Sequence, residues 1–182
     1  MKSEKLISDI QNSTNECISS AEKLKSKTEE ELNWKQNSET WSILECLEHL
    51  NLYAKFYLPE IENAIQNAKS KPQEEFKSGF WGNYFAKSML PKEKLNKMKT
   101  AKNKNPLNSK LDKNVIENFI AQQKEFCNLL EQAKNVDLNK EKTKISITNL
   151  IKLKLGDTFL FLNNHTFRHL KQIENIEKNA CR

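Results

Sequence analysis

The scarcity of residues that turn a polypeptide chain limits what this sequence can fold into. Among its 182 residues there are only three glycines and four prolines. A fold rich in β-strands needs many tight turns, and tight turns favour glycine and proline. Hydrophobic residues instead recur at intervals of three and four along extended stretches, which is the spacing of one face of an α-helix. We therefore predict an all-α fold.

Four amphipathic segments have this helical spacing. They cover about residues 3–30, 42–68, 112–134 and 153–178. Ser42 and Glu45 have the S-x-x-E spacing of a capping box, in which each side chain satisfies a backbone N–H at the start of a helix. Pro59 lies inside the second segment and predicts a kink there, or the end of the helix.

The second and third predicted helices are separated by a long connection, residues 71–111. A connection of this length in a compact domain is usually either functional or disordered, and aromatic side chains within it need burial. We expect it to cover one end of the bundle, with a short helix near residues 82–89. The chain is thus predicted to be a single domain, residues 1–182, folded as a four-helix bundle with a long crossover connection between helices 2 and 3. The aromatic cluster in the connection comprises Phe76, Phe80, Trp81, Tyr84 and Phe85.

Charge and cysteine usage narrow the possible partners and the compartment. The net charge is +6, with lysine densest in residues 90–105, but acidic residues are interleaved and no nucleic-acid-binding motif is present. We expect a solvated lysine-rich surface and no nucleic-acid partner. No segment has the roughly 20 apolar residues needed to span a bilayer, so we expect no membrane partner. Four isolated cysteines, Cys181 among them, and the lack of a signal-peptide core favour a reducing, cytoplasmic location.

The three histidines of the chain have a spacing that suits a metal site. His165 and His169 are four residues apart in the fourth predicted helix, so their imidazoles lie on one face, one turn apart. His49 lies in the second predicted helix. If these two helices are neighbours, three imidazoles can converge on one divalent ion and leave coordination positions open for chemistry. The alternative is three buried histidines that only make hydrogen bonds in the core.

Four further residues near the histidines each have a functional and a structural interpretation. Glu45 lies one turn before His49 and can act as a general base or can serve only in the capping box. Arg168 can orient an anionic substrate or form an ion pair between helices. Gln172 is expected to pack or hydrogen-bond near His169. Cys46 is expected in the core, with a role as a fourth ligand as the alternative.

Two motifs resemble those of a known superfamily. The first is Trp-Ser-x-x-Glu-x-x-x-His, formed by Trp41, Ser42, Glu45 and His49. The second is His-x-x-Arg-His-x-x-Gln, formed by His165, Arg168, His169 and Gln172. In this order and at this separation, they resemble the DinB-like, YfiT-like superfamily of metal-binding four-helix bundles, and the resemblance covers residues 34–176.

The resemblance implies a nickel or zinc ion held by His49, His165 and His169, with water completing the coordination, and a homodimer. It also implies a small-molecule substrate, because superfamily members transfer or isomerise groups with low-molecular-weight thiols or are described as metal-dependent hydrolases. The thiol-dependent enzymes often have an acidic residue one turn after the first histidine, where this chain has Leu52 and Tyr53. We therefore expect a metal-dependent hydrolase or a thiol-dependent transferase. The alternative is a non-catalytic module that binds metal or a small ligand.

Overall fold

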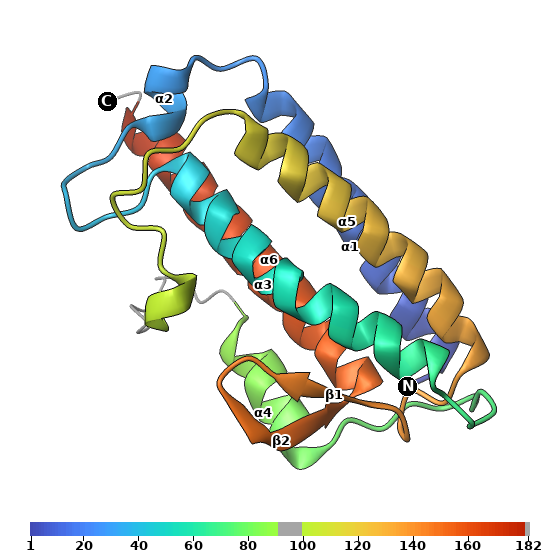
Figure 1. Ribbon diagram of the computed structural model, residues 1–182. Helices are drawn as coiled ribbons and strands as arrows, with labels where there is room; N and C mark the ends of the chain where they lie inside the picture. Colours follow the sequence, from blue (N-terminus) through green and yellow to red (C-terminus); the bar gives the residue numbers. More distant parts are fainter. Residues whose placement is uncertain (91–99, 181–182) are drawn as a thin grey trace.

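A computed structural model describes residues 1–90 and 100–180 and shows a bundle of four long helices (Figure 1). Each helix packs against two others, because α1 and α3 both contact α5 and α6. This arrangement confirms the all-α class and the four-helix bundle, and it makes α3 and α6 neighbours. The central lysine-rich residues 91–99 and Cys181 lie outside the described residues. The four helices are α1 (Ser3–Leu24), α3 (Ile43–Gln66), α5 (Asn114–Gln132) and α6 (Leu155–Ala180).

The hydrophobic core consists of two clusters that follow one another along the bundle. On α3, one cluster extends to Leu50 and the other begins at Ala54. On α6, one cluster ends at Leu162 and the other begins at Ile173. The interval between the clusters on α6 contains His165 and His169, which are buried although they are polar. Apolar layers therefore enclose this polar section of the bundle from both ends.

The predicted starts of the helices agree with the structure more closely than the predicted ends do. The capping box of α3 is present, with the Glu45 amide donating to Ser42 Oγ at 3.2 Å and the Ser42 amide donating to Glu45 Oε2 at 2.8 Å. Helix α3 continues through Pro59 to Gln66, so the proline does not end it. The first predicted helix is too long, because α1 ends at Leu24 and a separate short helix, α2 (Glu29–Asn33), follows.

A two-stranded antiparallel sheet, which the helical spacing does not predict, precedes the last helix. It consists of β1 (Lys142–Ile145) and β2 (Thr148–Lys154), and α6 begins directly afterwards at Leu155 instead of at residue 153. Side chains of β1 alternate between exposed and buried, as expected for a strand with one face on the core. Strand β1 packs against α3, which places the hairpin across one end of the bundle (Figure 1).

The long connection between α3 and α5 contains the predicted short helix, α4 (Phe80–Ser88), and a 3-10 turn, η1 (Lys102–Lys104). Helix α4 packs against α6 and β2. The buried carboxylate of Asp157 accepts hydrogen bonds from the Gly79 amide at 2.9 Å and from the Ser78 hydroxyl, so α6 supplies the N-terminal cap of α4.

The expected burial of the aromatic cluster is only partly correct. Phe76 is buried against the bundle, but Phe80, Trp81 and Tyr84 are exposed. They are exposed because α4 contacts the bundle through its small residues Gly82 and Ala86, which turns the large side chains outward. Within residues 1–90 and 100–180, none of the helices combines the length and the apolar character needed to cross a membrane.

Candidate metal centre

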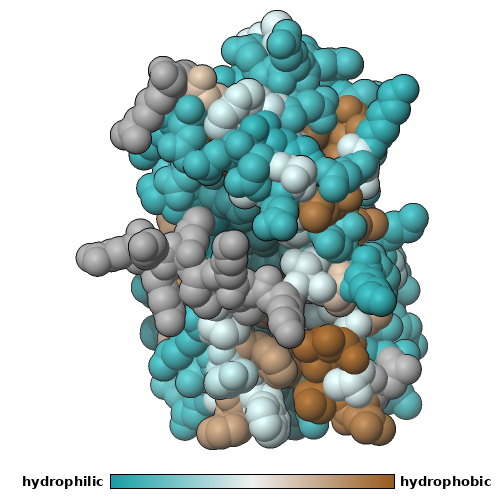
Figure 2. Space-filling model, turned by 90° about the vertical axis from the view of Figure 1, so that its left-hand side faces the viewer, coloured by the Kyte–Doolittle hydropathy of each residue, from teal (hydrophilic) through white to brown (hydrophobic). Residues whose placement is uncertain are grey.

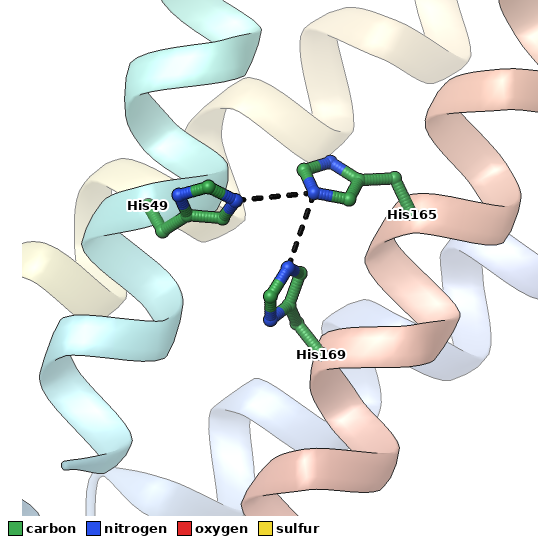
Figure 3. A group of neighbouring side chains, drawn as sticks. All are labelled: His49, His165 and His169. Atoms are coloured by element: carbon green, nitrogen blue, oxygen red, sulfur yellow. Dashed lines mark hydrogen bonds between the residues drawn. The ribbon is translucent and has the colours of Figure 1, made fainter. Parts of the chain in front are cut away.

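The three histidines meet in the polar section of the bundle, between α3 and α6 (Figure 3). His165 and His169 extend from successive turns of α6, and His49 faces them from α3. The Nε2 atom of His165 lies 3.1 Å from Nε2 of His49 and 3.1 Å from Nε2 of His169. All three side chains are buried. The convergence predicted from the sequence is therefore present.

In His49 and His169, the ring nitrogen that points away from the triad, Nδ1, lies next to a hydrogen-bond acceptor. This contact determines whether the other ring nitrogen, Nε2, carries a hydrogen. Nδ1 of His49 lies 2.6 Å from the backbone carbonyl oxygen of Lys104. A carbonyl oxygen only accepts, so Nδ1 carries the hydrogen and Nε2 keeps its lone pair. Nδ1 of His169 lies 3.0 Å from Gln172 Oε1, which accepts in the same way. Both lone pairs are directed at His165, the arrangement that partners of metal-binding histidines usually impose.

The donor set fits a divalent ion. Two nitrogens that bind one ion at about 2.1 Å stand about 3.0–3.4 Å apart, depending on the coordination angle. The two Nε2 separations that involve His165, 3.1 Å each, fall in this range, and the ligand nitrogens of all three histidines lie within 4.8 Å of one another. Hydrogen bonds alone explain the site less well, because Nε2 of His165 carries at most one hydrogen and faces two lone pairs. Imidazole donors suit zinc, nickel, copper and iron.

The burial of the triad keeps the imidazoles neutral. Burial is the largest cause that lowers the pKa of His49 to about 4 and that of His169 to about 3. The pKa of His165 is lowered well below its usual value by burial and by the neighbouring histidines and Arg168. Neutral imidazole is the form that binds a metal, so at neutral pH the three nitrogens are in the ligand form before any ion arrives.

Aromatic rings enclose the histidines on two sides. Trp41 stacks on His169, with ring centroids 5.7 Å apart, and its indole N–H donates to Asn105 Oδ1 at 3.2 Å. On the other side Phe161 stacks on His165 at 5.7 Å, and Tyr53 lies 4.5 Å from the same ring. Tyr53 and Phe161 are not among the site residues expected from the sequence. Their positions one turn from His49 and His165 on the same helix faces are the pattern that identifies them.

Glu45 lies in the structure where its capping role placed it. Its Oε1 accepts from the Lys35 ammonium at 2.8 Å and from the Asn108 amide at 2.5 Å, and its Oε2 accepts from the Ser42 amide. The carboxylate therefore ties the start of α3 to residues 105–108, the segment that follows the Lys104 carbonyl. In this way Glu45 supports the loop that orients His49.

The other three residues singled out in the sequence have different surroundings. Arg168 is buried on α6, burial lowers its pKa, and its charge is close enough to lower the pKa of His165 and His169. Gln172 hydrogen-bonds to His169, as expected. Cys46 is fully buried in an apolar cluster, and burial raises the pKa of its thiol, so it is a protonated core residue.

Replacing Gln172 with leucine is expected to weaken metal binding by about 10- to 100-fold, because the variant removes the acceptor that directs the His169 lone pair inward. The measurement is competition for zinc against a coloured chelator. Lys171→Ala is the matched control, since Lys171 is exposed on the same helix turn and pairs with Glu174. Equal affinities of Gln172→Leu and the wild type would show that Gln172 does not position the ligand.

The stability of the metal-free protein is expected to fall as the pH is lowered from 7 to 5.5. The unfolded chain protonates its histidines near pH 6.5, whereas His49 and His169 in the folded state stay neutral until about pH 4 and 3. Acid therefore favours the unfolded state, by about 1 kcal/mol per histidine between pH 6.5 and 5.5. Urea unfolding at several pH values measures this, and His169→Asn should reduce the slope. A stability that does not change over this window would contradict the neutral, buried triad.

Comparison with known proteins identifies one family. The family model of the DinB superfamily matches residues 19–173, which include all three histidines. No curated protein and no solved structure matches the sequence.

Proposed function

The chain belongs to the DinB superfamily, and on this basis we propose that it is a metal-dependent enzyme that acts on a small molecule. His49, His165 and His169 hold a nickel or zinc ion. The observation that carries the proposal is the convergence of three buried Nε2 atoms, two of which have their lone pairs directed inward by acceptors at Nδ1. A site that only needed hydrogen bonds would not require this orientation.

The protein's own residues prepare the site for a nucleophilic reaction. When bound, a divalent ion with three imidazole ligands lowers the pKa of water or of a thiol toward neutrality and polarises a substrate oxygen. The rings of Trp41, Tyr53 and Phe161 provide apolar walls around the histidines, which strengthens electrostatic interactions there by excluding water. Arg168, buried beside His165 and His169, supplies a positive charge that attracts an anionic group of the substrate.

We propose hydrolysis or transfer to a low-molecular-weight thiol as the reaction class. We also propose a cytoplasmic location and a homodimer. Cys17, Cys46 and Cys127 are free, as a reducing compartment requires. A catalytic role of Glu45 would require its carboxylate to leave the capping box, so the proposal gives Glu45 a positioning role in the reaction.

The second candidate is a module that binds metal or a small ligand without catalysis. The hydrogen bonds of Glu45 favour it, because they leave this carboxylate engaged away from the histidines. No other acidic side chain joins the His49, His165 and His169 group within the described residues. Under this alternative the chain has the ligands of an enzyme but lacks a positioned proton acceptor.

One experiment separates the two candidates. The zinc- and nickel-loaded protein is assayed with activated ester and amide substrates, and with an electrophile plus a low-molecular-weight thiol. An enzyme shows turnover that depends on the loaded metal, is absent in His49→Ala, and falls in Arg168→Gln mainly with anionic substrates. A protein that binds one ion per chain but shows no turnover above that of His49→Ala supports the binding module.

A further inference from the structure

Exposed hydrophobic side chains are concentrated at one end of the molecule. Eight large hydrophobic residues are exposed among the described residues, and six of them lie in segments 77–90 and 142–155. These segments contain α4 and the β1–β2 hairpin, and Leu150 in β2 has 94% of its surface exposed. We call their outer face the α4–hairpin surface. Its hydrophobic members are Phe80, Trp81, Tyr84, Leu90, Ile147 and Leu150.

The same two segments account for the net charge of the protein. They contain six lysines and no aspartate or glutamate, so they carry a charge of +6. The whole chain has 30 basic and 24 acidic residues, which leaves 24 of each outside these segments. The excess charge of the chain therefore equals the charge of these two segments. The lysines are Lys77, Lys87, Lys142, Lys144, Lys152 and Lys154.

Packing joins the two segments into one surface. Helix α4 contacts β2, and the Lys154 ammonium donates to the Lys77 carbonyl oxygen at 2.6 Å. On the hairpin, Lys142 and Lys144 are exposed and pair in register with Lys154 and Lys152. Figure 2 shows hydrophobic side chains gathered toward the lower end of the molecule, where α4 and the hairpin lie. Of the six lysines, only Lys144 forms an ion pair in the described part of the chain, with Glu60 at 3.6 Å.

We propose that the α4–hairpin surface binds the face of a bilayer that contains anionic phospholipids. The aromatic rings, Ile147 at the hairpin turn and Leu150 of β2 enter the boundary between headgroups and acyl chains, and the lysines lie at the level of the phosphates. The two segments combine exposed apolar side chains with lysines and contain no acidic residue, which is typical of elements that bind at a bilayer interface. Each lysine near an anionic bilayer adds a favourable electrostatic contribution, so two segments that supply six lysines, one of them paired with Glu60, complement it.

Other occupants fit this surface less well. A second copy of the chain in a symmetric dimer would place the same patch on both sides, and six lysines would then face six lysines. Single-stranded nucleic acid binds to aromatic platforms, but the most exposed residue here is aliphatic, and a leucine offers no ring for base stacking. The lack of a segment that could span a bilayer, from which we expect no membrane partner, excludes only a transmembrane mode of binding. Binding at the interface needs no such segment.

The test is co-sedimentation of the full chain with vesicles. Vesicles of phosphatidylcholine with 30% phosphatidylglycerol, about a third anionic lipid, are compared with vesicles of phosphatidylcholine alone. We expect binding to the anionic vesicles that weakens as salt is raised, and little binding to the neutral ones. Lys142→Gln/Lys152→Gln is expected to weaken partitioning by about 30-fold. Trp81→Ser/Leu150→Ser is expected to weaken it by about tenfold or more.

Matched variants keep the test specific. Phe167→Ser removes an exposed aromatic from α6, and Lys23→Gln removes an exposed lysine from α1, so neither should change partitioning. All substitutions are at exposed positions, and circular dichroism checks that the variants fold. The proposal is overturned if the anionic vesicles are not bound, or if the control variants lose binding as much as the surface variants do. It is also overturned if the surface variants abolish dimerisation or binding to polyuridine while vesicle binding is unchanged.

Discussion

Replacing His165 with alanine is expected to lower the affinity for zinc or nickel by at least about 100-fold. Loss of a hydrogen bond that only supports a ligand lowers metal affinity by about 10- to 100-fold, and loss of the ligand itself should lower it further. His165 is the central member of the triad, with its Nε2 atom 3.1 Å from those of both His49 and His169. Its removal leaves two imidazoles from different helices and no ligand between them. Competition titration of untagged protein against a chelator of known affinity measures the change.

The control for this variant is Cys46→Ala, which removes a buried side chain close to His49 in sequence but outside the triad. We expect it to keep the wild-type metal affinity while it loses some stability, since a buried side chain leaves a cavity. If Cys46→Ala loses metal and His165→Ala retains it, the ligand set proposed here is wrong.

Gly82→Ala is expected to lower the free energy of unfolding by about 3 kcal/mol, although alanine normally favours a helix over glycine by about 1 kcal/mol. A Cβ atom at residue 82 would overlap the Cβ and Cγ atoms of Asp157, which lie near the α6 backbone and cannot swing away as a long side chain can. The carboxylate of Asp157 also caps α4 through the Gly79 amide and the Ser78 hydroxyl. The methyl group would therefore displace α4 and break these hydrogen bonds.

Urea denaturation measures the effect, with Asn83→Ala as the matched control. Asn83 is the next residue of α4 and is exposed, so alanine there should be neutral or slightly stabilising. Hydrogen exchange should show faster exchange in α4 of Gly82→Ala than in the wild type. A Gly82→Ala variant as stable as Asn83→Ala would mean that α4 does not dock on Asp157 as described.

Periodicity and spacing were sufficient to predict the bundle and the triad. The helical repeats gave four long helices because each of them has one buried face, and the spacing between His165 and His169 gave one common face of α6. The capping box at Ser42 and Glu45 located the start of α3 to the residue, because its hydrogen bonds are local. Local rules of this kind do not depend on the tertiary structure.

Features that depend on contacts between distant segments could not be predicted in the same way. The acceptor for His49 is the backbone carbonyl of Lys104, 55 residues away, and a carbonyl oxygen has no sequence signature. The exposure of Phe80, Trp81 and Tyr84 follows from how α4 docks on α6, which the hydrophobicity of these residues does not reveal. The hairpin at residues 142–154 does show alternation, Lys-Thr-Lys-Ile in β1, but over a segment too short to outweigh the helical pattern beside it.

The most direct test of the metal centre is elemental analysis of the untagged protein after exposure to zinc and nickel and removal of unbound metal. Three neutral, converging imidazoles predict about one ion per chain for the wild type, at neutral pH. A protein that emerges without metal and takes up none from an excess would contradict the account. His49, His165 and His169 would then be buried core histidines, and the proposed enzymatic function would fall with the metal site.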